Sequence, residues 1–229
     1  MPEPRSLTDE QDWAAHLERG RSRYEDGESR LPGAEDADAR QRQLTRLGNA
    51  AGGAGLALLM QGRPDEAGEW FHRAANRYRE SFGDAPPGSW GRPIGAVKSL
   101  VLAGDWAGAE EAARWALEAG AAASDSPIGR YAAALALLVL GDDERARLQT
   151  DAIRTHDGFP ADVGDALAYL AAHDVAGYIE AVGAVLESFE VREEYLEDMP
   201  VADTVLVLQA LARRRGIEVE LSSPLLPGS

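Results

Sequence analysis

The sequence has no cysteine, and Lys98 is its only lysine. Without cysteine, disulfides, thiol chemistry and thiolate metal sites are excluded. Long apolar runs are also missing. The longest one, from Tyr131 to Leu140, is far shorter than the roughly 20 residues of a membrane-spanning helix. The first residues, MPEPRSLTDEQ, carry no apolar signal-peptide segment. We therefore expect a cytoplasmic protein with no membrane partner.

Motifs of catalysis are scarce as well. The histidines show no His-Glu-x-x-His spacing, and no Gly-x-Ser-x-Gly nucleophile motif occurs. The acidic run Asp142-Asp143-Glu144 resembles the start of an aspartate-rich prenyl-binding motif, but Ala146 stands where another aspartate belongs. We interpret the run as helix capping. The sequence thus predicts no catalytic residues, no metal, no cofactor and no enzymatic activity.

Negative charge dominates the composition. The 39 acidic residues against 23 basic ones give a formal net charge of −16, which disfavours nucleic acid as a partner. High acidity with arginine in place of lysine is typical of salt-loving archaea, so the charge can be a property of the host. A basic protein partner is the functional alternative, and the sequence leaves both interpretations open.

Alanine and leucine, both strong helix formers, make up most of the apolar fraction. We expect one all-α domain over residues 1–229 with about nine to ten helices. The first helix begins after Thr8, which has capping-box spacing to Gln11, and is ended by Asp26-Gly27 and then by Leu31-Pro32-Gly33. A third helix is expected to start at Arg63-Pro64-Asp65. The other expected helices span Ala34–Gln61, Ser89–Ala103, Asp105–Ala121, Pro127–Leu140, Asp142–Thr155, Ala161–Ala172, Asp174–Glu194 and Val201–Arg215.

Glycine marks special points in this pattern. The pair Gly52-Gly53 inside an expected helix indicates a kink or close helix–helix packing. A phosphate loop would need a Lys-Ser or Lys-Thr that is absent. The stretch from Phe82 to Gly88 is the clearest loop, and residues 217–221 form a short extended tail or strand.

Four similar turns divide the middle of the chain. They lie at Gly62, Gly104, Gly141 and His173, 32–42 residues apart, and each joins an apolar helix to an amphipathic one. An aspartate that can cap the next helix follows each turn. This period predicts antiparallel helical hairpins, arranged as a tetratricopeptide-like right-handed array or as a closed helical bundle.

Five residues are candidates for binding a protein partner. Trp90 follows the Pro-Gly loop and is either an exposed interface anchor or a plug packed on the core. Glu193, Glu194, Glu197 and Asp198 form an acidic cluster that lacks the Asp/Asn/Gly frame of a calcium loop. The cluster is either a solvated surface or a docking site for arginine and lysine of a partner.

The last third of the chain carries a family resemblance. It contains Phe189-Glu190, Tyr195-Leu196-Glu197-Asp198, the apolar helix Val201–Ala212, Arg215-Gly216 and a Ser222–Pro227 ending. This pattern resembles the carboxyl-terminal signature of the immunity protein 49 (Imm49) family. About 40 residues match closely, and the preceding part is compatible in style.

The resemblance implies a helical immunity protein that neutralises a polymorphic toxin by stoichiometric binding, with the cognate toxin encoded nearby. The family has no catalytic residues to transfer to this chain. An alternative from another class is a tetratricopeptide-like adaptor that binds a peptide or a partner protein. A helical enzyme is a third class, for which the sequence offers no motif.

Overall fold

The computed structural model describes residues 12–156 and 158–228. Within these residues it contains ten α-helices, three short 3-10 helices and no strand, so the all-α prediction is confirmed. The α-helices are α1 Trp13–Arg30, α2 Ala37–Met60, α3 Pro64–Phe82, α4 Gly91–Leu102, α5 Trp106–Glu118, α6 Pro127–Leu140, α7 Asp143–Arg154, α8 Ala161–Ala171, α9 Val175–Glu190 and α10 Asp203–Arg213. The 3-10 helices are Leu31–Gly33, Ala121–Ala123 and Leu196–Asp198.

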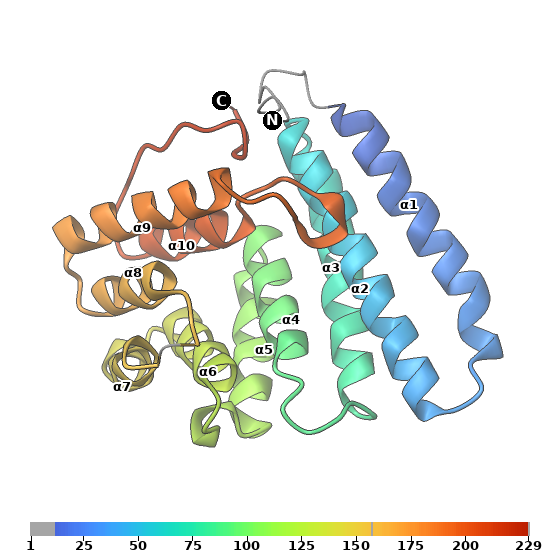
Figure 1. The fold of residues 1–229 in the computed structure, drawn as a ribbon, viewed down its shortest axis with the longest axis horizontal. Helices are drawn as coiled ribbons and strands as arrows, with labels where there is room; N and C mark the ends of the chain where they lie inside the picture. Colours follow the sequence, from blue (N-terminus) through green and yellow to red (C-terminus); the bar gives the residue numbers. More distant parts are fainter. Residues whose placement is uncertain (1–11, 157, 229) are drawn as a thin grey trace, which may run out of the picture.

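Consecutive helices pack against each other as hairpins along the chain (Figure 1). The first helices of neighbouring hairpins also touch, since α4 contacts both α2 and α6, and α6 contacts α8. Helix α10 leaves this order. It returns along the molecule and packs on α4, α8 and α9. The side of the hairpins formed by α4 and α8 is therefore covered by the chain itself.

The four turns have the conformation that the sequence predicts. Gly62, Gly104 and Gly141 have φ of 70°, 71° and 74°, and His173 has φ of 55°. This left-handed backbone ends a helix and suits glycine, which has no Cβ to clash. Asp105, Asp142 and Asp174 then cap α5, α7 and α9, as expected. Helix α3 differs, because it starts with Pro64 and has no side-chain cap.

The histidine turn leads to a stability prediction. Replacing His173 by glycine should raise the free energy of unfolding by about 0.5 kcal/mol, because the left-handed conformation costs a side-chain-bearing residue about 1 kcal/mol. The lost contact from Nε2 to Asp143, 2.8 Å long, offsets only part of the gain, because the His173 side chain is 58% exposed. Urea unfolding measures the change, and an unchanged or lower midpoint would contradict it.

The ends of α1 depart from the prediction. The helix starts at Trp13, and the Asp12 side chain accepts a hydrogen bond of 2.9 Å from the Ala15 amide. Thr8 and Gln11 lie outside the described residues. Of the two expected stop signals, Asp26-Gly27 does not end the helix, since α1 continues to Arg30, whereas Leu31-Pro32-Gly33 does follow its last residue. Gly27 is buried in the contact with α2, where a Cβ would come within 2.8 Å of the side chains there. Gly27 therefore allows α1 and α2 to pack closely and does not end the helix.

Helix α2 is unbroken, so the kink expected at Gly52-Gly53 is wrong. Close helix–helix packing does occur in α2, but at other glycines. A Cβ on Gly48 would lie 2.8 Å from the Tyr78 ring, and one on Gly55 would lie 2.7 Å from the Phe71 ring. A Cβ on Gly52 would meet nothing within 4 Å. Helix α3 thus packs closely on α2 at Gly48 and Gly55, which precede and follow the predicted pair Gly52-Gly53.

The carboxyl-terminal third is less helical than expected. Helix α9 stops at Glu190 and not at Glu194, and α10 is shorter than the expected Val201–Arg215. The tail after α10 is extended chain without a strand. It is anchored where Leu225 and Leu226 are buried and the Leu225 carbonyl accepts a hydrogen bond of 3.0 Å from the Ala202 amide. The tail therefore ties down the start of α10.

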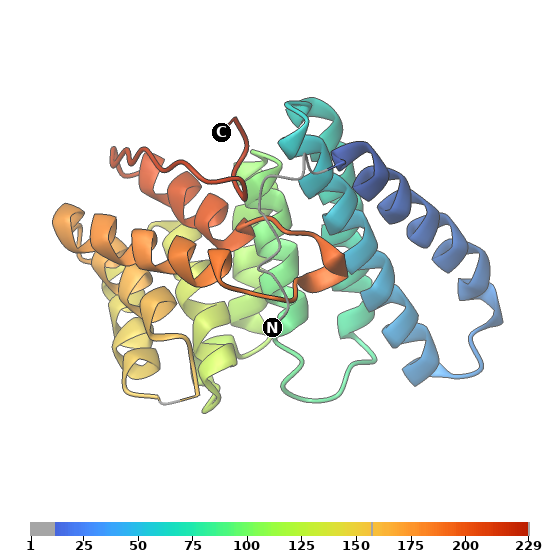
Figure 2. The same ribbon diagram turned by 45° about the horizontal axis from the view of Figure 1, so that its top comes forward.

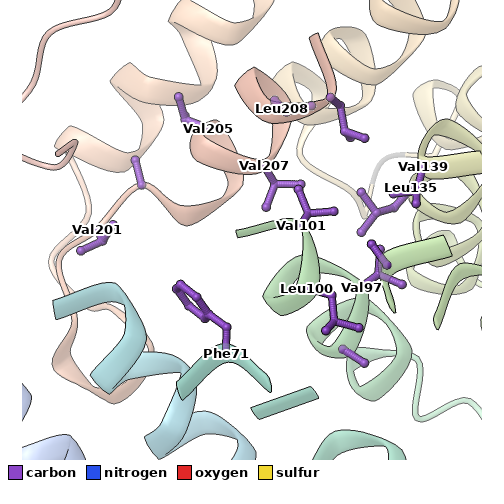
Figure 3. Close-up of a cluster of buried hydrophobic side chains, with 14 of the residues drawn as sticks. Phe71, Val97, Leu100, Val101, Leu135, Val139, Val201, Val205, Val207 and Leu208 are labelled. Atoms are coloured by element: carbon purple, nitrogen blue, oxygen red, sulfur yellow. The ribbon is translucent and has the colours of Figure 1, made fainter. Parts of the chain in front are cut away.

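Apolar side chains from many helices meet in one connected core, part of which is drawn in Figure 3. Val205, Val207 and Leu208 of α10 are at most 1% exposed. Figure 3 shows Val207 beside Val101 of α4, the helix on which α10 packs. This apolar contact holds α10 on the hairpins, since burying one such side chain contributes about 1.5–3 kcal/mol.

Arginines after α10 attach its end to the α6–α7 hairpin. Arg215 has a side chain only 7% exposed. It forms a salt bridge with Asp143 and donates hydrogen bonds to the carbonyls of Leu138, at 2.8 Å, and Leu211, at 3.1 Å. Arg214 donates to the Val139 carbonyl at 3.1 Å. Two of the three arginines in the run therefore have partners within the chain.

Candidate functional site

The segment that joins α9 to α10 crosses the molecule to reach α2 (Figures 1 and 2). We call residues 191–202 the strap. The strap displays Val191, which is 81% exposed, and Leu196, which is 68% exposed. Among the described residues these are the two most exposed large apolar side chains. Its other end is buried, with Met199 5% and Val201 2% exposed. The strap is thus an anchored segment with an apolar outer edge.

Charge pairs and a strained turn fix the strap in place. Arg23 of α1 contacts Glu197 at 2.7 Å and Asp198 at 3.2 Å. Glu197 and Asp198 have φ of 58° and 57°, a left-handed backbone that non-glycine residues rarely adopt. The Tyr195 hydroxyl donates to the Phe189 carbonyl at 2.6 Å. These contacts hold the turn in one conformation. The exposed side chains of the strap therefore project from a fixed backbone.

A cavity of about 400 Å³ lies between the strap and helices α2, α3 and α4. Its lining is mainly apolar, and glycines leave part of the helix surfaces open. The apolar side chains of the lining are Leu56, Phe71, Ile94, Leu102, Phe189, Leu196, Met199 and Val201, with Gly52, Gly53 and Gly95 beside them. The volume falls in the range of small ligand pockets, which are also mainly apolar with a few polar groups.

The lysine of the chain belongs to this cavity. Lys98 Nζ lies 2.5 Å from Asp203 Oδ2 and 3.1 Å from Thr204 Oγ1. Burial is the largest single effect and lowers the pKa of Lys98, but the charge and hydrogen bond of Asp203, together with Tyr131, outweigh it, so that the pKa is raised above its usual value. Lys98 is therefore a charged group joining α4 to α10, and not a neutral amine nucleophile.

Other polar groups of the cavity wall have neutral partners. Arg92 donates to Ser81 Oγ at 3.1 Å and to Gln41 Oε1, and burial lowers its pKa. The Tyr78 hydroxyl donates to Asn49 Oδ1 at 2.9 Å, and burial raises its pKa. These contacts order the wall of the cavity and leave some hydrogen-bonding capacity on the Arg92 guanidinium, which has five donors.

The structure separates the five predicted partner-binding residues. Glu193 and Glu194 are exposed on the strap, and Glu194 lines the cavity. Glu197 also lines it, but Glu197 and Asp198 already pair with Arg23. Trp90 is half-buried outside the cavity lining. Its ring centroid lies 6.3 Å from that of Phe82, so it occupies the position of a plug packed on the core.

The sequence did not predict that Lys98 and Arg92 line a site, nor did it predict the cavity itself. One signal was available, because a single lysine within an otherwise apolar helix is unusual in a chain of arginines. The acidic run after Gly141 has the predicted capping role. Asp142 accepts a hydrogen bond from the Arg145 amide at 3.2 Å. Asp143 pairs with Arg215 and His173, so neither aspartate faces the cavity.

Among residues 12–156 and 158–228, no group of three or more His, Asp or Glu side chains is placed to hold a metal ion. None of the helices formed by these residues is both long and apolar enough to span a membrane. The chain matches no family model, no curated protein and no solved structure.

Proposed function

We propose that the chain binds a protein partner stoichiometrically and acts as an immunity protein that neutralises a polymorphic toxin. The observation that carries the proposal is the strap. An anchored segment that exposes Val191 and Leu196 beside the free carboxylates of Glu193 and Glu194 has the composition of a protein-binding surface. Preorganised surfaces of this kind lose little entropy when they bind.

The resemblance to the immunity protein 49 family supports the same proposal. The residues that carry the resemblance, from Phe189 to Pro227, correspond to the end of α9, the strap, α10 and the tail. Members of that family are expected to act by binding a toxin. A formal charge of −16 suits a basic toxin such as a nuclease. In concentrated salt the screening length is about 3 Å at 1 M, so close contacts would supply the affinity.

The adaptor alternative has less support. An adaptor of the tetratricopeptide type offers its partner a groove lined by the first helices of its hairpins. In this chain α10 packs on two of those first helices, α4 and α8, and buries Val205, Val207 and Leu208 there. A peptide would have to displace α10 from this apolar contact, whereas the strap is free to meet a partner.

A pull-down tests the proposed function. The tagged full chain is incubated with extract of its own host at host-like salt, and the bound proteins are identified by mass spectrometry. We expect one stoichiometric partner that is toxic when expressed alone and harmless when co-expressed with this chain. Several unrelated partners, peptides sharing one motif, or a single partner without toxicity would overturn the proposal.

A further inference from the structure

We infer that the cavity beside the strap receives one large apolar side chain from a basic segment of the protein partner. This inference rests on the proposed function and adds the interface and the chemistry of the partner. Other exposed apolar side chains, such as Leu148, Val175 and Ile179, do not line this cavity. The strap combines an exposed apolar edge with an adjoining apolar cavity.

The apolar arrangement has the form of an interface hot spot. Leu196 lines the mouth of the cavity and is 68% exposed, while Phe71 and Met199 line the cavity from buried positions. Hot spots typically place one anchor side chain in a fully desolvated pocket surrounded by weaker contacts. The volume of about 400 Å³ is sufficient for an aromatic or long aliphatic side chain.

Charge along the strap, and not in the cavity wall, indicates which residues flank that anchor, because the charged residues of the wall balance: Arg92, Lys98 and Arg192 against Glu194, Glu197 and Asp203. Residues 190–198 contain five carboxylates and one arginine. Arg23 pairs with two of the carboxylates, those of Glu197 and Asp198. Glu190, Glu193 and Glu194 have no salt bridge to any described residue. Arg192, the arginine of this stretch, lies 3.6 Å from the Phe189 ring centroid. The strap therefore keeps excess negative charge that lysine or arginine of a partner would neutralise.

The cavity can be tested with peptides before any partner is known. A random peptide library displayed on phage is panned on the immobilised full chain, and enriched peptides are synthesised for affinity measurements. We expect the enriched sequences to share one aromatic or large aliphatic residue next to lysine or arginine. Enrichment of acidic sequences, or no enrichment above the uncoated support, would overturn the inference.

Matched variants connect the peptides to the cavity. Leu196→Asp changes an exposed side chain at the mouth, and Gly52→Leu fills the cavity from α2, where a Cβ meets nothing within 4 Å. Each variant should weaken peptide binding at least tenfold. Leu148→Asp, on a residue 65% exposed on α7, should leave it unchanged. Thermal unfolding of all three variants shows whether they fold like the parent chain.

The outcomes separate this inference from the proposed function. Peptides that bind the Leu196→Asp and Gly52→Leu variants as tightly as the parent chain would overturn the cavity as their site. If the pull-down yields a toxin whose binding also ignores both variants, the immunity function stands and the interface lies elsewhere. If the peptides behave as expected but no toxin is found, the cavity is supported as a binding site for a basic segment, and the proposed immunity function is overturned.

Discussion

Replacing Arg215 by alanine is expected to lower the free energy of unfolding by about 3 kcal/mol. The side chain is 7% exposed, and its loss leaves Asp143 without the arginine of its salt bridge. The Leu138 carbonyl, at 2.8 Å from the guanidinium, also loses its donor. Removing one partner of a buried charge pair typically costs about 3–5 kcal/mol, and the partial exposure of Asp143 places the estimate at the lower end.

Arg213 provides the control for this prediction. It belongs to the same run of arginines but is exposed, and no described residue forms a salt bridge with it. Arg213→Ala should therefore change the stability by less than about 0.5 kcal/mol. Arg215→Lys should fall between the two alanine variants, because lysine keeps the charge but not the forked hydrogen bonds. Guanidinium unfolding gives all three values, and equal losses for the two alanine variants would show that Arg215 does not anchor α10.

The second large effect comes from two glycines of α2 that are three residues apart. Gly55→Ala should destabilise the protein by about 2 kcal/mol, because the new Cβ would lie 2.7 Å from a carbon of the buried Phe71 ring. Gly52→Ala should stabilise it by about 1 kcal/mol, because alanine favours the helix and its Cβ meets nothing within 4 Å. The same substitution thus has opposite signs within one helix.

Thermal and urea unfolding of the two single variants test this pair. The parent chain is the reference, and circular dichroism shows whether the helical content is retained. If both variants are stabilised, the Phe71 ring moves aside at little cost, and the contact between α2 and α3 is less closely packed than the distances indicate. If both are destabilised, the space beside Gly52 is occupied in solution.

The sequence predicted those parts of the fold that depend on neighbouring residues. The left-handed turns at Gly62, Gly104 and Gly141 follow from local backbone preferences, and so do the aspartate caps after Gly104 and Gly141 and most of the helices. The stop at Leu31-Pro32-Gly33 after α1 was predicted correctly, but the earlier stop at Asp26-Gly27 was wrong, because Gly27 is typical of a helix stop when it is considered alone. Only the position of α2 shows that Gly27 is a packing residue.

The candidate site was predictable only in part. The acidic cluster was found, but its division into paired and exposed members was not. Arg23 and Glu197 are 174 positions apart, and Lys98 and Asp203 are 105 apart, so no local pattern connects them. Helix α9 was extended to Glu194 because residues after Glu190 still fit a helical pattern. Residues 191–194 of the strap were therefore expected to be helical, and the exposed edge of the strap was not recognised.

These long separations have a consequence for the order in which the molecule is completed. The hairpins from α2 to α9 join residues close in sequence, so each one can form as it leaves the ribosome. Arg23 is synthesised early, but it can form its ion pairs only after Glu197 and Asp198 have been synthesised. Lys98 likewise pairs only once Asp203 is present. The strap and the cavity are thus the last parts of the molecule to fold. A partner that recognises them would distinguish a finished chain from one still being translated.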